Sequence, residues 1–465
     1  MNAVVAMDIA GHMKKSVSTN SLSEYSFSSI SNTHPAAEKF WVACSGGMDS
    51  SVLLHLFYSN KNKIKQALEV IYVNHGLQEK SDEWGKFCKE QCKHYDISFS
   101  QLEIIEPVPK GISIEAWARE KRYSLIARSM NNNDVLFTAH HQDDQVETFF
   151  LQALRGSGPR GLASMPSVKP FSKGFHARPL LHYKRSELLT YANNNGLVWH
   201  DDISNSDTRH DRNYLRHNIL PEIEARWPAY RETISRMVNH QKEYKSLLDE
   251  LGCDDMKLAL HENTMSLHLE VIQKLSVERQ KNLIFTWLDE LQLNSPGSKH
   301  MTQIISDLIY SSSDKAPCVN WKNVEIRRYR NLLYASKSLD KHNVNQEYDW
   351  NPESPLSFMD ETLIAKPEIG KGISRIKMKN AKFVVRYRQG GEKIQPDDLA
   401  HSKTVKQLFQ ERGVLPWLRD RIPLIYINGK LAVIPGFCVD KHCSAAKDES
   451  SWDIQWSGYE KVIQL

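Results

Sequence analysis

The chain has 465 residues, a length that exceeds one ordinary hydrophobic core and predicts about two to four domains. Its 60 lysines and arginines against 56 aspartates and glutamates give a formal net charge of +4, which permits a nucleic-acid partner without requiring one. No apolar run reaches the roughly 18 residues of a membrane helix, so we expect no membrane association. Seven scattered cysteines favour a reducing compartment over a disulfide framework, and we expect a cytoplasmic protein.

The first 35 residues differ in composition from the rest of the chain. A weakly apolar start precedes the basic pair Lys14 and Lys15, whereas a secretion signal has the opposite order. Residues 16–34 are rich in Ser, Thr and Asn, which predicts a disordered leader over residues 1–35. The sequence leaves the role of this leader open, because an overlong start and a targeting extension both fit.

From residue 39, strand-like and helix-like segments alternate. The expected strands cover residues 40–45, 68–76, 97–104 and 134–141, and the expected helices begin at residue 50 and cover residues 82–95, 113–130 and 143–154. Apolar strands separated by amphipathic helices predict βα units in an α/β fold with a doubly wound parallel sheet. Ligands of such sheets bind beyond the carboxyl ends of the strands. The segments "SGGMDS" (45–50), "VNHG" (73–76) and "HHQDDQ" (140–145) fall there.

After about residue 225 the pattern changes. A long polar helical stretch begins at Ala229 and could bridge two domains. Further helical segments, short strand-like pieces and a polar linker follow, and the last part mixes strands with one helix. We therefore predict an α/β domain at 36–226, a mainly helical middle domain at 227–340, a linker at 341–355 and a small α+β domain at 356–465.

The loop from Ser45 to Ser50 has the composition of an anion cradle. Its glycines allow positive φ and close backbone approach, and the following helix adds a partial positive charge at its start. The lysine of the common phosphate-binding motif G-x-x-x-x-G-K-S/T is missing. Asp49 cannot bind phosphate directly because like charges repel, so it would act through Mg²⁺. The alternative is a plain turn in which Asp49 and Ser50 cap the helix.

A second group of polar residues lies at the start of the helix after residue 141. Asp143, Asp144 and Glu147 are spaced so that some of them share one face. One acidic group is enough to interact with the helix dipole, whereas three together fit a Mg²⁺ site better. His140 and His141 could contact a nucleotide or its ribose. We expect no zinc site, because the two histidines are adjacent and lack partners at ligand spacing.

Two arginines mark the helix at 113–130. Glu115, Arg119 and Arg122 share one face, and such a stripe is stabilising by about a few tenths of a kcal/mol when it is only solvated and ion-paired. Alternatively, Arg119 or Arg122 stabilises negative charge on a phosphate as bonds break. Residue spacing does not choose between the two.

Several segments together resemble a known family. "SGGMDS" resembles the pyrophosphate-binding loop (PP-loop) of the N-type ATP pyrophosphatases, which split ATP into AMP and pyrophosphate. With "IEAWAREKRY" (114–123), "TAHHQDDQVETFFLQALRGSGPRGLASM" (138–165) and "DISNSDTRHDRNYLRHNILP" (202–221), it resembles the bacterial tRNA(Ile)-lysidine synthetases. Residues 388–426 resemble the C-terminal tRNA-binding domain of that family. The resemblance covers about residues 39–460 and is weakest in the middle; the leader and Met48, in place of the commoner leucine, depart from it.

The resemblance implies a fold and a reaction. The fold is a PP-loop ATP-binding catalytic domain followed by two tRNA-binding domains. ATP would adenylate the C2 carbonyl oxygen of the wobble cytidine (position 34) in the isoleucine tRNA with anticodon CAU. Free L-lysine would then attack C2 and expel AMP, forming lysidine and changing codon reading from AUG to AUA.

The resemblance also assigns roles to residues. The ATP-binding residues would be Ser45, Gly46, Gly47, Met48, Asp49, Ser50 and His140. Asp49 with Asp143 or Asp144 would bind Mg²⁺ and act in catalysis, and the spacing of the acidic helix start adds Glu147 as a further candidate ligand. Arg119 or Arg122 would contact the α-phosphate. The lysine-binding residues remain unassigned, and a homodimer is expected from the family alone.

Basic residues in two segments predict contacts with tRNA. Arg212 and Arg216 lie one helical turn apart and could meet phosphate or a flipped-out cytidine, although surface ion pairs fit equally well. A second group surrounds Trp417 and suits the backbone of an RNA helix. Its members are Lys403, Lys406, Arg412, Arg419 and Arg421.

Two rival functions are compatible with the fold. A tRNA thiolase of the same ATP class would need a cysteine pair for sulfur or an iron–sulfur cluster, and Cys88 and Cys92 are four residues apart. Packing on a helix explains those cysteines better, because Trp84 and Phe87 share their apolar face. A non-catalytic RNA-binding factor would carry a damaged loop, whereas the loop and all three carboxylates are intact here.

Overall fold

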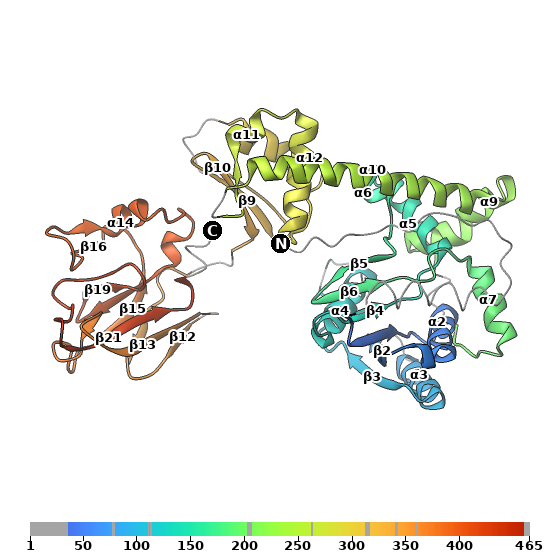
Figure 1. Cartoon of the computed structure of the whole chain (residues 1–465), viewed down its shortest axis with the longest axis horizontal. Helices are drawn as coiled ribbons and strands as arrows, with labels where there is room; N and C mark the ends of the chain where they lie inside the picture. The colour runs from blue at the N-terminus through green and yellow to red at the C-terminus, as the bar shows by residue number, and fades with distance from the viewer. Residues whose placement is uncertain are drawn as a thin grey trace. The chain divides into compact units, whose positions relative to one another are not determined.

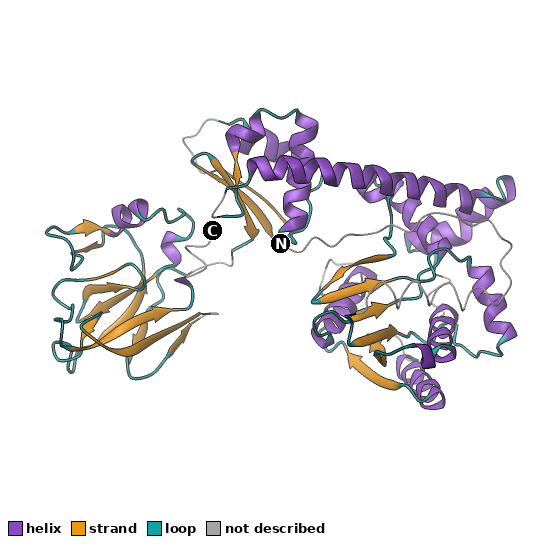
Figure 2. Cartoon of the chain, viewed as in Figure 1, coloured by secondary structure: helices purple, strands orange, loops and turns teal. Residues whose placement is uncertain are grey.

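The computed structural model describes residues 36–459, except 77–79, 110, 112–113, 202–206, 262–263, 312–316, 340–342 and 359–360. The predicted disordered leader lies outside the described residues. The chain divides into two compact units, residues 1–247 and 248–465 (Figures 1 and 2). The division falls inside the long helix α10 (Tyr230–Ala259), whereas the domain boundary predicted from the sequence precedes this helix.

The first unit is built on a six-stranded sheet in the order β3-β2-β1-β4-β6-β5. Its strands are β1 (Lys39–Ala43), β2 (Ala67–Asn74), β3 (Ser98–Glu103), β4 (Val135–Phe137), β5 (Val168–Phe171) and β6 (Gly174–Ala177). All neighbouring strands are parallel except β5, which runs antiparallel to β6 at the edge. The doubly wound parallel sheet predicted from the sequence is therefore confirmed, with an antiparallel edge strand that the pattern did not predict.

Helices follow the strands of this sheet. They are α2 (Met48–Ser59), the short 3₁₀ helix η1 (Lys61–Lys63), α3 (Ser81–Tyr95), α4 (Ile114–Ser129), α5 (Gln142–Leu154), α6 (Pro159–Leu162) and α7 (Arg185–Asn194). A further helical run comprises α8 (Asp211–Tyr214), the π-helical turn η3 (Leu215–Ile219) and α9 (Leu220–Arg226). Figure 1 shows helices on both faces of the sheet.

Alternating side chains of the central strand β1 explain the two helical layers. Successive residues of a strand point to opposite faces. Phe40 and Val42 belong to the core that packs against α2, α3 and α7. Trp41 belongs to a second core with Ile126 of α4 and Met130. Both faces of the sheet are thus buried, which leaves its carboxyl edge as the place where loops and helix starts meet.

The second unit begins inside α10 and contains the middle region. Its helices are α11 (Leu269–Gln273), α12 (Val277–Glu290), α13 (Ser298–Gln303) and the π-helical η4 (Ile304–Ile309). They accompany a four-stranded sheet in the order β7-β10-β9-β8, with β7 (Leu267–His268), β8 (Cys318–Trp321), β9 (Val324–Tyr329) and β10 (Leu332–Lys337). The helical middle region expected from the sequence is confirmed, and it also contains this sheet, which the sequence pattern did not predict. Strands β8 to β10 form because their apolar side chains close a core with α12 and η4.

The rest of the second unit is rich in β-structure. A five-stranded sheet contains β11 (Tyr348–Trp350), β15 (Phe383–Tyr387), β18 (Pro423–Ile427), β19 (Lys430–Ile434) and β20 (Cys438–Val439). A four-stranded sheet contains β12 (Leu356–Phe358), β13 (Glu361–Ile369), β14 (Ile373–Ser374) and β21 (Ser450–Trp456). The smaller elements are β16 (Lys393–Ile394), β17 (Lys403–Thr404), α14 (Val405–Glu411) and η5 (Arg419–Arg421).

Part of the predicted linker belongs to this last domain. Residues 348–350 form β11, which pairs antiparallel with β15 and buries Trp350 against the core. The polar residues around this short strand gave the segment the composition of a linker, so the sequence pattern did not predict the strand. Among the described residues, no helix is long and apolar enough to cross a membrane.

Candidate active site

The loop between β1 and α2 lies at the carboxyl edge of the sheet and is held by its own serines. Ser50 Oγ accepts a hydrogen bond from the Ser45 amide at 3.2 Å and donates to the Gly47 carbonyl at 2.9 Å. The first bond of α2 runs from the Ser51 amide to the Gly47 carbonyl at 3.0 Å. The amides of Met48, Asp49 and Ser50 therefore precede the helical ladder and suit an anion.

The Asp49 side chain does not cap this helix. The capping position is Gly47, and no side chain caps the start of α2. Asp49 Oδ1 is buried and makes no hydrogen bond to a described residue. The interpretation of Asp49 as a plain capping residue is therefore wrong, and its carboxylate is available for another role.

Gly46 has a left-handed backbone conformation that favours glycine. Its φ of +80° is one that side chains with a Cβ rarely adopt, and a Cβ there would lie 3.5 Å from Cys88 Sγ. We expect Gly46→Ala to lower the free energy of unfolding by about 1–2 kcal/mol, because of the left-handed backbone, and to weaken ATP binding. Thermal unfolding without and with ATP measures both effects.

Gly47 supplies the matched control for that variant. Its φ is −79°, and an added Cβ would meet Ser45 Oγ at an ordinary 3.5 Å. Gly47→Ala should therefore unfold at the wild-type temperature in the absence of ATP. Equal destabilisation by the two substitutions would contradict a left-handed requirement at Gly46.

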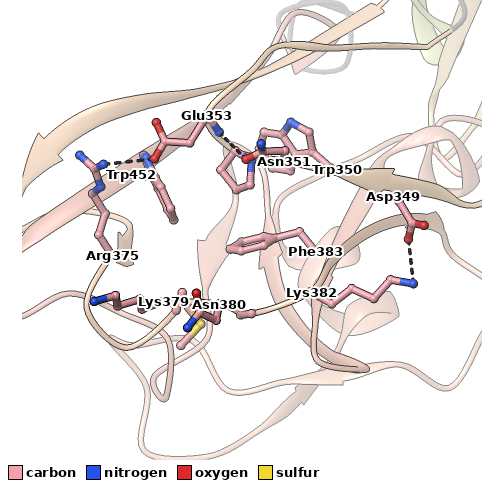
Figure 3. Close-up of a pocket in the computed structure, with 13 residues that line it drawn as sticks. Asp349, Trp350, Asn351, Glu353, Arg375, Lys379, Asn380, Lys382, Phe383 and Trp452 are labelled. Carbon is pink, nitrogen blue, oxygen red and sulfur yellow. Dashed lines mark hydrogen bonds and ion pairs between the residues drawn. The ribbon is translucent and has the colours of Figure 1, made fainter.

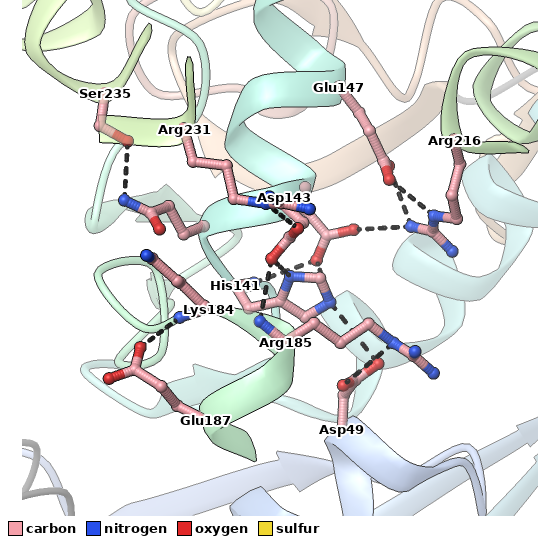
Figure 4. A network of polar contacts seen from close by, with 12 residues as sticks. Asp49, His141, Asp143, Glu147, Lys184, Arg185, Glu187, Arg216, Arg231 and Ser235 are labelled. Atoms are coloured by element: carbon pink, nitrogen blue, oxygen red, sulfur yellow. Dashed lines mark hydrogen bonds and ion pairs between the residues drawn. The ribbon is translucent and has the colours of Figure 1, made fainter. Parts of the chain in front are cut away.

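The acidic start of α5 faces this loop through His141, which precedes the helix (Figure 4). His141 Nε2 lies 3.7 Å from Asp49 Oδ2 and 3.5 Å from Asp144 Oδ2. Its Nδ1 lies 3.7 Å from Asp143 Oδ2. Burial acts to lower the pKa of His141, but Asp144 and Asp49 outweigh it and raise that pKa above its ordinary value. The imidazole thus joins carboxylates from two elements that are far apart in sequence.

Arginines from later elements pair with the carboxylates of α5. Arg231 Nε donates to Asp143 Oδ1 at 2.6 Å (Figure 4). Arg216 donates from Nε and Nη2 to the two oxygens of Glu147 at 2.6 and 2.9 Å. Arg216 also reaches Asp144 Oδ1 at 3.4 Å, and Arg212 Nε lies 3.5 Å from Glu147 Oε2. The acidic helix start is therefore a network of ion pairs, in which Glu147 is 1% exposed.

These pairs bear on the expected set of Mg²⁺ ligands. Glu147 and Asp143 are both paired with arginines at 2.6 Å, and their role as Mg²⁺ ligands stays a prediction. Across the part of the chain that the structure describes, no group of three or more His, Cys, Asp or Glu side chains is arranged to hold a metal ion. Asp49 Oδ1, which makes no hydrogen bond to a described residue, fits one Mg²⁺ ligand. One or two carboxylates with substrate phosphates are the usual way in which proteins bind Mg²⁺.

His140 lies at the same edge and is neutral. Burial lowers its pKa to about 3, with Asp144 opposing and Arg178 and Arg119 assisting the shift. Arg119 is exposed and stacks over the Tyr123 ring at 5.3 Å, whereas Arg122 is half-buried. Of the two arginines, the structure thus brings Arg119 electrostatically close to His140. The side chain of Glu115, the third member of their predicted stripe, lies outside the described residues.

Arg212 and Arg216, predicted to contact tRNA, instead face α5. Arg216 lies in the π-helical turn η3, and such turns are frequent at functional sites. Arg212 donates from Nη2 to Thr148 Oγ1 at 3.1 Å. The Arg216 guanidinium is paired with Glu147, as the ion-pair alternative expects, and contact of Arg212 or Arg216 with tRNA stays a prediction.

The sequence did not single out Arg231 or Arg185. Arg185 contributes its backbone amide to Asp143 Oδ2 at 2.9 Å, and its Nε lies 4.0 Å from Asp49 Oδ1. Arg185 and Arg231 lie 42 and 88 positions after Asp143, and neither belongs to a local motif. Only their charge type could have pointed to them.

The basic residues of the C-terminal domain have different environments. Lys406 and Arg412 are exposed, Arg421 is half-buried, and Lys403 is paired with Glu411 at 2.7 Å. Arg419 is only 8% exposed; its Nε donates to the Val414 carbonyl at 2.9 Å and its Nη2 to Tyr329 Oη at 3.2 Å. The expectation that Arg419 contacts tRNA is therefore corrected, because this arginine holds the chain turn after α14.

The same domain contains a cavity of about 570 Å³ that the sequence did not predict (Figure 3). Trp350, Phe383 and Trp452 are buried aromatic residues of its lining. The cations on its rim are paired: Arg375 with Glu353 at 3.2 Å and Lys382 with Asp349 at 3.1 Å. The cavity therefore combines an aromatic lining with a charge-balanced rim.

Family models match three parts of the chain. A model described as PP-loop domain matches residues 19–223, which include the loop and the acidic helix. The models described as TilS substrate binding domain and TilS substrate C-terminal domain match residues 267–334 and 383–456. The first unit thus belongs to the PP-loop class of nucleotide-binding domains, as its sheet order and glycine loop indicate.

Comparison with individual proteins identifies the family within the PP-loop class to which the chain belongs. The tRNA(Ile)-lysidine synthase of Coxiella burnetii is 37% identical, over 90% of this chain and 92% of the relative. That of Methylococcus capsulatus is 36% identical, over 87% and 92%. A solved structure of a U34-tRNA thiolase from Methanococcus maripaludis matches with a TM-score of 0.40 and 18% identity. The match covers 48% of this chain and 79% of that chain, and a likeness this weak says nothing about function. The chain belongs to the tRNA(Ile)-lysidine synthase family.

The cysteines do not form the site that a thiolase would need. Cys88 and Cys92 are at most 1% exposed and lie in the main core of the first unit. Cys88 Sγ lies 3.5 Å from Cys44 Sγ, in the layer between β1 and α3. This arrangement agrees with packing as their explanation.

Proposed function

We propose that the protein uses ATP and Mg²⁺ to adenylate the wobble cytidine of the isoleucine tRNA with anticodon CAU, and then joins free L-lysine to C2 of that base. The observation that carries the proposal is the loop Ser45–Ser50, whose Asp49 meets the acidic start of α5 through His141, in a chain of this family. The product is lysidine, and the proposed location of the reaction is the cytoplasm.

The chemistry agrees with the residue types at the site. A carbonyl oxygen is a poor leaving group until it is esterified to phosphate, whereas AMP leaves readily. Amides at the start of α2 would hold the departing pyrophosphate, because preorganised donors stabilise developing negative charge. Mg²⁺, when bound, neutralises phosphate charge, and Asp49, with an oxygen that makes no hydrogen bond to a described residue, would be its protein ligand. Arg119, exposed near His140, is the better of the two arginines for the α-phosphate.

The charge network on α5 supports a zwitterionic second substrate. Lysine carries a carboxylate that needs a cation and amines that need carboxylates. Asp144 and Glu147 lie beside Arg212 and Arg216 in this network, so both signs of charge are present within one patch next to the loop. We place lysine there, with the ε-amine directed towards the adenylated base.

The exposed basic residues of the C-terminal domain would contact the tRNA body. Lys406 and Arg412 are exposed and lie in and after α14, where phosphate contacts would depend on salt concentration. A homodimer remains an expectation from the family, and sedimentation equilibrium of the full chain would test it.

A substrate-omission assay tests the function. The protein is mixed with α-labelled ATP, labelled lysine and an isoleucine tRNA transcript with CAU. With transcript but no lysine, pyrophosphate should be released while AMP stays on the RNA. Adding lysine should release AMP and transfer the lysine label to the RNA. A transcript with uridine at the wobble position is the control and should give neither product.

Three outcomes would overturn the proposal. AMP release that needs neither tRNA nor lysine would show a different adenylation reaction. Sulfur transfer from a thiol donor to the same transcript, without lysine incorporation, would favour a thiolase. Tight RNA binding without any pyrophosphate release would favour a non-catalytic binding factor.

A further inference from the structure

Four polar side chains form a hydrogen-bonded chain at the carboxyl ends of β4 and β6. These strands are parallel neighbours, with Leu136 opposite His176. Thr138, directly after β4, places its Oγ1 2.7 Å from His140 Nδ1 and 2.8 Å from His176 Nε2. Arg178, directly after β6, places its Nη2 3.1 Å from His176 Nδ1. The chain therefore runs from Arg178 through His176 and Thr138 to His140.

The arginine sets the direction of every hydrogen in this chain. A guanidinium can only donate, so His176 Nδ1 must accept. A neutral imidazole carries its single hydrogen on the other nitrogen, so His176 Nε2 donates to Thr138 Oγ1. The threonine hydroxyl then has one hydrogen to give, and among the described residues His140 Nδ1 is the acceptor within reach. His140 accordingly carries its hydrogen on Nε2.

The surroundings of His176 keep its imidazole neutral. His176 is 1% exposed, and its ring lies 5.5 Å from that of Tyr123 and 5.8 Å from that of Phe171. Burial lowers the pKa of His176 to about 2, assisted by the charges of Arg178, Lys169 and Arg119.

Charged groups from three further elements face His140. Burial is the main cause of its lowered pKa. Asp144 of α5 opposes the shift, while Arg178, Arg119 of α4 and Arg212 of α8 assist it. The His140 ring therefore stays neutral although charged groups act on it, and it can donate a hydrogen bond without a charge of its own.

We propose that Thr138, His176 and Arg178 are positioning residues that fix His140 as a neutral Nε2–H donor towards an oxygen atom of a nucleotide substrate, either ATP or the target cytidine. The identity of the substrate rests on the proposed function, whereas the tautomer does not. One consequence is chemical: the nitrogen of His140 that remains for substrate already carries a hydrogen. His140 therefore cannot remove a proton from the lysine amine through that nitrogen.

The tautomer can be observed directly in the full-length protein labelled with ¹⁵N at histidine side chains. His140→Gln identifies the His140 signals by their loss. We expect the Nε2–H tautomer, unchanged between about pH 6 and pH 8, where an ordinary histidine titrates. Finding the Nδ1–H tautomer, or protonation of His140 within this range, would overturn the proposal.

Thr138 variants test the relay against a merely structural role. Thr138→Val keeps the shape but removes the hydroxyl, so both tautomers of His140 should become populated and kcat should fall roughly tenfold or more, as for a misplaced transition-state donor. Thr138→Ser should restore the wild-type tautomer and most of the rate. A valine variant that is folded, with the wild-type tautomer and the wild-type rate, would contradict the relay.

The two sources of the acceptor oxygen are separated by adding ligands one at a time. A non-hydrolysable ATP analogue with Mg²⁺ is added first, and an anticodon stem-loop RNA is added to a second sample. The ligand whose oxygen accepts the hydrogen bond should shift the His140 Nε2 resonance in the wild type and much less in Thr138→Val. No shift with either ligand overturns the donor role. If lysidine formation itself is wrong, the omission assay fails while the tautomer result stands, so the two failures are distinguishable.

Discussion

Asp49→Ala should abolish pyrophosphate release and leave tRNA binding close to the wild-type value. The Asp49 carboxylate has a buried oxygen without a hydrogen-bond partner among the described residues, beside the loop that we expect to hold the triphosphate. Loss of its charge would remove the protein ligand of Mg²⁺, which we expect to lower kcat by at least about 10²-fold. Pyrophosphate release and filter binding of labelled tRNA measure the two quantities.

Asp49→Asn separates a metal ligand from other roles. Asparagine caps a helix as well as aspartate does, but it lacks the charge that favours Mg²⁺. The asparagine variant should therefore be nearly as inactive as the alanine variant. Wild-type activity in Asp49→Asn, or loss of tRNA binding in either variant, would show that this residue has a different role.

A control for these variants comes from the opposite side of the same domain. Asp96 is fully exposed and paired with Lys61 at 2.9 Å, away from the carboxyl edge of the sheet. Asp96→Ala removes one acidic charge from the first unit without touching the loop. Its activity should equal that of the wild type, which excludes a general effect of net charge.

Arg216→Met should strongly destabilise the first unit. Glu147 is 1% exposed and accepts two hydrogen bonds from Arg216, so removing the guanidinium leaves a buried carboxylate with only Arg212 at 3.5 Å. Breaking a buried ion pair in this way typically costs about 3–5 kcal/mol, and we expect about 3 because Arg212 remains. For a unit of this size, that corresponds to a fall in Tm of roughly 6–12 °C.

The measurement is calorimetry of the transition that ATP shifts upward, since ligand binding identifies the ATP-binding unit. Replacing both Glu147 and Arg216 by Met should recover most of the lost stability, because no unpaired charge then remains buried. Arg209→Met is the matched control. Arg209 lies in the same segment, but its side chain is 89% exposed and pairs with Asp207 at 2.6 Å. Replacing Arg209 should therefore change Tm little.

The opposite result would support the prediction that Arg216 contacts tRNA. Unchanged Tm together with weaker tRNA binding would mean that the pair with Glu147 is dispensable and that the guanidinium contacts RNA. The two explanations therefore predict different measurements for the same variant.

Local patterns were enough to predict the fold of the first unit. The alternation of short apolar strands and helices depends on side chains that are neighbours along the chain, so the predicted strands and helices of residues 39–154 agree with β1 to β4 and α2 to α5. The middle region was predicted less well. The strands β8 to β10 are short, and their pairing depends on contacts with η4 and α12 that no local pattern reveals.

The sequence by itself determined the chemistry-bearing segments: the glycine loop Ser45–Ser50, the acidic helix start at Asp143 and their common place after strand ends. Each is a compact local motif, and parallel strands bring such motifs to one edge by geometry alone. Only the tertiary structure decided which charges meet. Arg216 and Arg231 reach the acidic helix across 69 and 88 residues of sequence, and Arg419 is buried although it lies in a basic segment. A charged side chain carries no sequence mark of its partner or its burial, because both are properties of the folded chain.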